Sequence, residues 1–252
     1  MIEVELDPKV GIFHNLEKIY KKIKELKKKA ENLKNQIYEN EKKLKQIEIE
    51  VEIEKKVLER KLTKKWYEKF RWFFTSNNFL LIAGKDAITN EILINKYLEK
   101  NDLVVRADIH GSPFGILKNG ISAKEEDILE SAKFVASYSR AWKMKLRVLD
   151  VYYIFSDQIS KKTPSGEYLK KGSFMIYGKR NYIRTNLELA IGFEEELIPG
   201  VPESVMKKTK NYVVLIPGDI KPLEIAKKIS KILNYPIIDD IIKLIPGSSE
   251  LK

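Results

Sequence analysis

A long run of sequence without proline or glycine, from Leu16 to Lys65, most constrains how this chain can fold. Its apolar residues recur at alternating steps of three and four, which is the a/d spacing of a coiled coil. This seam passes through Leu16, Ile19, Ile23, Leu26, Ala30, Leu33, Ile37, Leu44, Ile47, Val51 and Leu58, with polar Asn40 and Glu54 at two further positions. The unbroken register predicts one helix, about 75 Å long for ~50 residues, and Asp7-Pro8 is its predicted start signal.

One stretch of this run, Gln46–Glu54, alternates apolar and polar residues as a strand does. We predict helix there because the heptad phase continues through it. The charges of the run are polarised, with an early group at Lys21, Lys22, Lys24, Lys27, Lys28 and Lys29 and a late group at Glu48, Glu50, Glu52 and Glu54. They fit either a solvated coiled-coil face or a basic prong that contacts phosphate.

The charge of the whole chain favours a polyanionic partner. Its formal net charge is +11, and 33% of its 252 residues are charged. Nucleic acid and an acidic membrane surface are the two candidate partners. The alternative is a thermophile's enrichment in lysine and glutamate, since such organisms increase both residues.

The sequence also excludes several chemistries. It has no cysteine, which rules out disulfides, thiolate metal sites and cysteine nucleophiles. A P-loop, a dinucleotide glycine fingerprint and an HExxH motif are missing, so we expect no cofactor and no metal. The N-terminus does not resemble a signal peptide, and no apolar run approaches the ~20 residues of a membrane span. We therefore expect a cytoplasmic protein without a membrane partner.

Beyond the helix, strand and helix patterns mix without a strict βαβ rhythm, which favours the α+β class. We predict a coiled-coil helix over residues 1–65, a mixed α/β domain over 66–193 and a small α/β extension over 194–252. Expected strands cover 79–83, 103–109, 147–155, 172–177, 187–193 and 212–216, and expected helices cover 86–100, 222–233 and a segment from a capping box at Ser122–Glu125 towards Trp142.

Three shorter patterns carry further predictions. The aromatic stretch KWYEKFRWFF has helical spacing, so we expect it to dock the long helix onto the core. LIPG occurs three times, at 197–200, 215–218 and 244–247, and we interpret the copies as similar exits from strands into turns. Pro164-Ser165-Gly166 predicts a turn.

The most chemical-looking motif is DIHGSP. Asp108 and His110 stand two apart at the end of a predicted strand, so their side chains should point to the same side. Together they could bind a metal, act as general acid and base, or clamp a phosphate or base edge. The alternative is a polar turn in which Asp108 fixes the tautomer of His110. The other histidine, His14, fits a surface or capping role at the helix start.

A second constellation is basic and lies between residues 161 and 184. Its cations are Lys161, Lys162, Lys170, Lys171, Lys179, Arg180 and Arg184, and Tyr168, Phe174, Tyr177 and Tyr182 are interleaved with them. Cations for phosphate and aromatic rings for stacking are what recognition of single-stranded RNA uses. The alternative is a strand with a solvated lysine face.

Several strings of the sequence resemble the NFACT-R domain of the NFACT family, which includes eukaryotic nuclear export mediator factor, archaeal counterparts and bacterial proteins once labelled fibronectin-binding. The similar strings are KWYEKFRWFFTSNNFLLIAGKDAITNE, DLVVRADIHGS, SYSRAWKMK and ISKKTPSGEYLKKGSFMIYGKRNY. LDPKVGIFHNLEKIYKKIKELKKK resembles the family's coiled-coil helix before that domain. The resemblance runs from about Leu6 to Phe193, and the LIPGDIKP segment is similar to archaeal members.

This resemblance implies a role in ribosome-associated quality control. Members of the family bind the large ribosomal subunit that carries a stalled peptidyl-tRNA and recruit aminoacylated tRNA for untemplated tail addition. The implied partners are therefore large-subunit rRNA and tRNA. Combining the matched motifs with the basic constellation, the candidate RNA contacts are Lys85, Asp86, Asn90, Glu91, Arg106, Asp108, His110, Gly111, Lys118, Arg140, Trp142, Lys161, Lys162, Lys179, Arg180 and Arg184.

The chain also departs from the family pattern. Lys85 stands where the family often has Arg, and the large N-terminal domain, the helix-hairpin-helix segment and the first coiled-coil arm have no counterpart. We therefore expect either a piece of a longer protein or a short family member, whose open seam could drive self-association. Our leading hypothesis is a non-enzymatic RNA-binding protein. The alternatives are a nucleic-acid-processing enzyme that uses Asp108 and His110, and a coiled-coil module that binds another protein.

Overall fold

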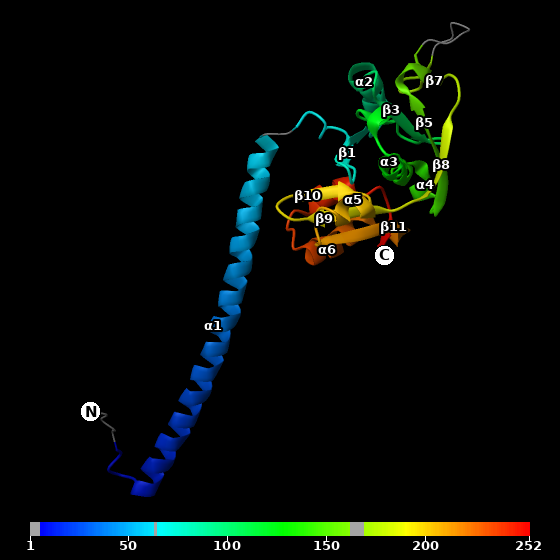
Figure 1. Cartoon of the computed structure of the whole chain (residues 1–252). Helices are drawn as coiled ribbons and strands as arrows, with labels where there is room; N and C mark the ends of the chain where they lie inside the picture. Colours follow the sequence, from blue (N-terminus) through cyan, green and yellow to red (C-terminus); the bar gives the residue numbers. More distant parts are fainter. Residues whose placement is uncertain (1–5, 63–64, 162–168) are drawn as a thin grey trace. The chain divides into compact units, whose positions relative to one another are not determined.

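The long helix predicted from the heptad seam is the first element of the fold. A computed structural model describes residues 6–62, 65–161 and 169–252 of the chain (Figure 1). Helix α1 spans Ile12–Leu62. Gln46–Glu54 continues this helix, so the choice of helix over strand is confirmed.

The helix starts later than the sequence predicted. Asp7-Pro8 was expected to open it, but these residues begin a turn in which the Val10 N–H donates to the Asp7 carbonyl, and α1 begins at Ile12. The buried side chain of Asn15 fixes this turn, because its amide oxygen accepts from the Asp7 N–H at 3.0 Å and its amide nitrogen donates to the Asp7 carbonyl at 3.0 Å. The predicted start signal is therefore wrong by about one helical turn.

The seam of α1 is open along the residues that the structure describes. Leu26, Leu33 and Ile37 expose 55%, 57% and 57% of their surface. Most helical stability in proteins comes from packing an apolar face, so a helix with this seam is suited to a partner. Self-association through the seam stays a prediction.

The chain divides into two compact units, Met1–Lys55 and Lys56–Lys252. The second unit has an α+β fold, as predicted, with two larger antiparallel sheets and one two-stranded sheet. None of the helices in the described residues is both long enough and apolar enough to cross a membrane.

The larger sheet has six strands in the order β1-β2-β4-β3-β5-β8. Its strands are β1 (Arg71–Phe74), β2 (Leu80–Ala83), β3 (Leu103–Ala107), β4 (Gly115–Leu117), β5 (Val148–Phe155) and β8 (Asn181–Asn186). The prediction that KWYEKFRWFF is helical is wrong. Residues 71–74 pair with β2 as an edge strand, while Tyr67 and Phe70 turn into the core.

Three helices accompany this sheet. They are α2 (Ala87–Tyr97), α3 (Glu125–Ser137) and the short α4 (Arg140–Lys143), with 3-10 turns at Gly120–Ser122 and Ser156–Gln158. Helix α3 packs against β3, β4, β5 and β8. Ser122 does not open α3 as predicted, because the Asp127 carboxylate accepts from the Lys124 N–H at 3.1 Å and Ser122 lies in the preceding 3-10 turn. The expected single helix towards Trp142 is divided into α3 and α4.

The second sheet has four strands in the order β10-β9-β11-β12. It contains β9 (Leu189–Phe193), β10 (Leu197–Gly200), β11 (Tyr212–Ile220) and β12 (Ser249–Leu251), with helices α5 (Pro202–Met206), α6 (Pro222–Leu233) and α7 (Ile238–Leu244). The helix predicted over 222–233 with proline at its first position is confirmed. A two-stranded sheet pairs β6 (Ile159–Ser160) with β7 (Met175–Ile176).

The three LIPG copies do not share one structure. Residues 197–200 form β10 and residues 215–218 lie inside β11, whereas residues 244–247 follow from the end of α7. The interpretation as three similar strand exits is therefore wrong. The copies differ because each packs in different surroundings. Packing in the folded protein overrides the weak preference of a four-residue pattern.

Side chains of α3 and α4 tie the second sheet to the first. The Phe134 ring stacks on Phe73 with centroids 4.6 Å apart. The Tyr138 hydroxyl donates to the Leu244 carbonyl at 2.6 Å, and Trp142 Nε1 donates to the Ser248 carbonyl at 3.0 Å. Residues of α3 and of the segment after it thus contact both sheets, and the domain boundary at residue 193 stays a prediction.

Replacing Trp142 should destabilise the whole second unit. Its side chain is 1% exposed, so Trp142→Ala removes a buried ring and leaves a cavity. We expect the free energy of unfolding in urea to fall by about 3–5 kcal/mol. Trp66→Ala is the control, because Trp66 is 46% exposed, and the fall in that variant should be clearly smaller. Equal falls would contradict the role of Trp142 in joining the sheets.

Candidate nucleic-acid interface

A hollow of about 410 Å³ lies beside the DIHG motif. We call it the DIHG hollow, and it is lined by Arg106, Ala107, Asp108, Ile109, His110, Tyr152, Phe174, Met175, Ile176 and Arg180. These residues come from the end of β3, the turn after it, the middle of β5, strand β7 with the residue before it, and the residue just before β8. The hollow therefore brings together the DIHG motif and part of the basic constellation, which are separate in sequence.

Strand register explains why these side chains meet. Arg106 on β3 stands opposite Tyr152 on β5, and Tyr152 stands opposite Tyr182 on β8. Residues directly opposite in antiparallel strands share a face. The Tyr152 and Tyr182 rings have centroids 5.7 Å apart, and the Arg180 guanidinium lies 4.9 Å from the Tyr152 ring centroid. Three adjacent strands thus present cations and rings on one face.

Exposure separates the floor of this face from its rim. Tyr152 is 3% exposed and belongs to the core, whereas Tyr182 is 55% exposed. Arg180 is exposed, and Arg106 is half-buried with its guanidinium 4.3 Å from the Phe114 ring centroid. Asp108, His110 and Arg180 are therefore the exposed charged or polar groups of the hollow, and the exposed Tyr182 ring lies next to Tyr152.

The electrostatics of the rim favour an anion. A hydrogen bond with the Tyr182 side chain raises the pKa of Arg180, and the neighbouring tyrosines and Asp108 add to the rise. Burial raises the pKa of Tyr152, so its phenol stays neutral. Cations beside an exposed aromatic ring can contact phosphate and stack a base in the same site.

Asp108 and His110 lie in a turn and not on the strand as predicted. Strand β3 ends at Ala107, where the Ala107 N–H donates to the Ser112 hydroxyl at 3.0 Å. The alternation argument for Asp108 and His110 therefore fails, although both line the hollow. Among the described residues, no hydrogen bond or ion pair joins these two side chains. The structure thus gives no support to Asp108 fixing the tautomer of His110.

Gly111 and Arg140 meet at the far side of this turn. Gly111 has φ +81°, a backbone conformation that side chains disfavour. A Cβ atom there would lie 3.3 Å from the Arg140 Cβ. Arg140 is exposed at the start of α4, and it is not one of the residues that line the hollow.

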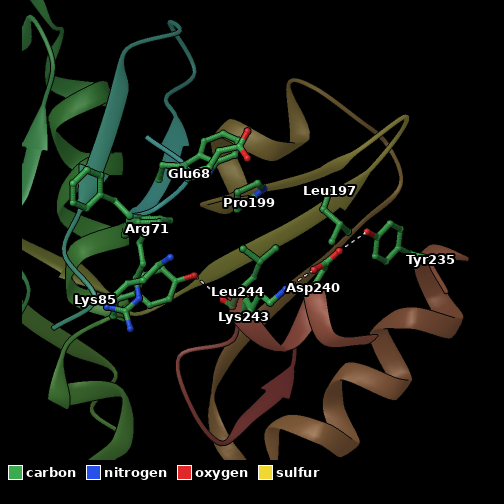
Figure 2. A pocket seen from close by; sticks show the side chains of 13 residues that line it. Glu68, Arg71, Lys85, Leu197, Pro199, Tyr235, Asp240, Lys243 and Leu244 are labelled. Carbon is green, nitrogen blue, oxygen red and sulfur yellow. Dashed lines mark hydrogen bonds and ion pairs between the residues drawn. The ribbon is translucent and has the colours of Figure 1, made fainter. Parts of the chain in front are cut away.

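Three residues of the GKDAITNE motif shape the fold around α2. Asp86 caps α2 by accepting from the Thr89 N–H at 2.7 Å. Asn90 accepts from the Phe114 N–H at 3.1 Å, and Glu91 accepts from the Gly172 N–H at 2.6 Å. Their side chains make bonds inside the protein, which is a structural role. Lys85 lies away from the DIHG hollow and lines a different pocket (Figure 2).

Three further residues predicted to contact RNA are engaged inside the protein. Lys118 is paired with the fully buried Asp102 at 2.6 Å. Lys161 is paired with Glu91 at 2.6 Å. Trp142 is in the core, so its ring cannot stack on RNA in this fold, and we correct its predicted role to a structural one.

The remaining predicted cations differ in position. Lys179 and Arg184 are exposed, and both are close in sequence to Arg180, which lines the hollow. Arg184 lies 3.6 Å from the Asp150 carboxylate. Lys162 and the predicted turn at 164–166 lie outside the described residues. The sequence reasoning missed Tyr152, whose only signal was its place in a predicted strand. No group of three or more acidic or histidine side chains that could hold a metal occurs in the described residues.

Comparisons with known proteins identify the family of this chain. Residues 69–178 match the family profile of the NFACT protein RNA binding domain, which covers β1 to β7 and the DIHG hollow except Arg180. The chain is 44% identical over 198 residues to an archaeal Rqc2 homolog, aRqcH, of Methanocaldococcus jannaschii, a match that covers 75% of this chain and 29% of that protein. By its α+β fold and these matches, the chain is a protein that contains an RNA-binding domain. The chain belongs to the NFACT family.

More distant relatives also match much of this chain and a small part of their own length. Ribosome quality control complex subunit 2 of Schizosaccharomyces pombe is 32% identical over 72% of this chain and 18% of its own length. The human ribosome quality control complex subunit NEMF is 38% identical over 51% of this chain and 12% of its own length. The chain thus spans less than a third of these relatives. Among solved structures, the C-terminal part of a fibronectin/fibrinogen-binding protein from Streptococcus suis matches with a TM-score of 0.41 and 19% identity over 47% of this chain and 45% of that one.

The pair formed by Glu91 and Lys161 should make stability depend on pH. The hydrogen bond from Lys161 lowers the pKa of Glu91 below its usual 4.5. The stabilisation is therefore complete above the unfolded-state pKa and disappears as pH falls through the lower, folded-state pKa. Urea unfolding at several pH values should show Glu91→Gln less stable than wild type at pH 7, with the gap closing in acid. Glu195→Gln, at an exposed loop position, is the control, and a gap that persists in acid would contradict the account.

Proposed function

We propose that this chain binds RNA in ribosome-associated quality control, through the rim of the DIHG hollow. The observation that carries the proposal is the register of β3, β5 and β8, which sets Arg106, Tyr152 and Tyr182 in one row. Arg106 and Arg180 line the hollow beside this row. The net charge of +11 supplies the long-range attraction for a polyanion. The match of residues 69–178 to an RNA-binding domain supports the same assignment.

The proposed partners follow from the relatives. The human and Schizosaccharomyces pombe relatives are named as ribosome quality control complex subunits, and we carry this role over to the present chain as part of the proposal. The RNA is then large-subunit rRNA or tRNA, and the site of action is the cytoplasm. We expect an RNA-binding role without catalysis.

The RNA bound in this proposal is single-stranded. Guanidinium groups bind phosphate, and an exposed tyrosine offers a stacking face to any base. The exposed Tyr182 ring and the flanking Lys179 and Arg180 have this combination. A regular RNA duplex keeps its bases stacked inside and could use only the cations.

Reversing two charges at the rim should weaken RNA binding strongly. Lys179→Glu with Arg180→Glu replaces two exposed cations by anions. We expect affinity for a labelled single-stranded RNA to fall at least tenfold, and the slope of log affinity against log salt to fall by roughly 0.7 for each phosphate that the protein no longer neutralises. The matched control is Lys227→Glu with Lys228→Glu, which makes the same charge change on the exposed face of α6. An equal fall in affinity for both variants would show that net charge alone controls binding.

Tyr182 should contribute through its ring. Tyr182→Ala is expected to weaken single-stranded RNA binding by about 1–3 kcal/mol, the usual value for one stacked base. Tyr182→Phe keeps the ring and removes only the hydroxyl that bonds Arg180, so it should bind nearly as wild type. If the alanine variant binds single-stranded RNA normally, Tyr182 is not the stacking residue.

A further inference from the structure

A second pocket, of about 220 Å³, lies where the first sheet meets the C-terminal sheet. Figure 2 shows it between β1, the C-terminal end of α3, β10 and α7. We call it the junction pocket. Strand β1 and strand β8 form opposite edges of the six-stranded sheet, so the junction pocket is separate from the DIHG hollow. Its volume is below the roughly 300–1,000 Å³ of drug-sized sites, so it suits one small planar group.

Five aromatic side chains line the junction pocket. They are Phe70, Trp72, Phe134, Tyr138 and Tyr235. Tyr138 is held in place because its hydroxyl donates to the Leu244 carbonyl at 2.6 Å, and burial raises its pKa to about 12. These fixed rings favour a flat aromatic ligand over a flexible aliphatic one.

One cation of the pocket is held in a defined orientation. The Arg71 guanidinium lies 4.6 Å from the Tyr138 ring centroid, and one of its nitrogens donates to the Gly84 carbonyl at 2.9 Å. Burial lowers the pKa of Arg71, although the group remains a cation. A guanidinium has five N–H donors, so this single bond leaves donors for a ligand.

The opposite wall supplies an acceptor. The Asp240 carboxylate accepts from Lys243 Nζ at 2.7 Å and from the Tyr235 hydroxyl at 3.2 Å. A carboxylate has about four lone-pair sites, so Asp240 can accept a further bond. Because Glu68 and Asp240 both line the pocket, a bare phosphate would meet negative charge as well as positive.

We propose that the junction pocket binds one unpaired guanine or cytosine base of the RNA. Both bases carry an exocyclic amino donor and a carbonyl acceptor, which complement Asp240 and Arg71. Uracil has no amino group, and adenine has no carbonyl group. This inference rests on the proposed RNA-binding function and adds a base-reading site to it. In the proposed function, the cations beside the DIHG hollow and the Tyr182 ring attract and stack RNA without regard to sequence, whereas the junction pocket gives a preference.

The test titrates each of the four nucleoside 5′-monophosphates into the full chain. The readout is the NMR signal of the Trp72 indole, assigned with a Trp72→Phe variant. The dissociation constants of guanosine and cytidine monophosphate, read from the shift of this signal, should be at least tenfold lower than those of the uridine and adenosine compounds. Inorganic phosphate should leave the signal in place. Asp240→Asn should remove the preference, and Arg71→Lys should weaken binding at least tenfold.

Controls separate this inference from the proposed function. The Lys179→Glu, Arg180→Glu variant should keep the response of Trp72 to mononucleotides while its binding of single-stranded RNA is weakened. A Trp72 signal that no mononucleotide moves would overturn the pocket assignment and leave the proposed function standing. An equal shift by inorganic phosphate would make the pocket an anion site. A shift caused only by short peptides would make it a peptide site, and either result would also overturn the inference.

Discussion

The antiparallel pairing of β5 with β3 on one side and β8 on the other is the constraint on which the candidate interface depends. It sets Arg106, Tyr152 and Tyr182 in one row across three strands. A slip of one residue would turn these side chains to the opposite face. The row is held because Val104 and Ile154 are also opposite each other and both are fully buried. Burial of the core thus fixes where the cations and the exposed ring lie.

Helix α3 and the residues that follow it hold the C-terminal sheet. Phe134 stacks on Phe73 of β1, and the next turns of the chain place Tyr138 and Trp142 against the segment from Leu244 to Ser249. Helix α3 therefore packs against the first sheet and also bonds the second. The junction pocket is a consequence of this packing, because its walls come from both sheets. It would not exist in a chain that ended with the matched RNA-binding domain.

The sequence predicted elements whose periodicity is strong and local. The heptad seam predicted α1, and the proline at the start of α6 predicted a helix whose bounds agree with the structure. The aromatic stretch before Phe74 was misread because edge strands and helices both tolerate closely spaced rings, and only the pairing with β2 decides between them. LIPG misled for the same reason, since four residues do not determine a tertiary neighbour.

The candidate site was predicted only in part. The DIHG motif and the basic stretch were recognised separately, and the structure brings Asp108, His110 and Arg180 around one hollow. Asp86, Asn90 and Glu91 were proposed as contacts because they share a motif with Lys85, but a motif does not separate residues that shape a fold from those that meet a ligand. Arg71 was missed because its pocket forms between two sheets.

Hydrogen–deuterium exchange of the full chain, with and without a mixed-sequence single-stranded RNA, tests the central claim most directly. It reports which backbone amides the RNA protects without altering any side chain. The account predicts slower exchange in the turn at 108–111 and in the segment 177–182, with α6 unchanged. Protection confined to α1, with no change around the DIHG hollow, would contradict it and would assign RNA contact to the lysine-rich part of the long helix.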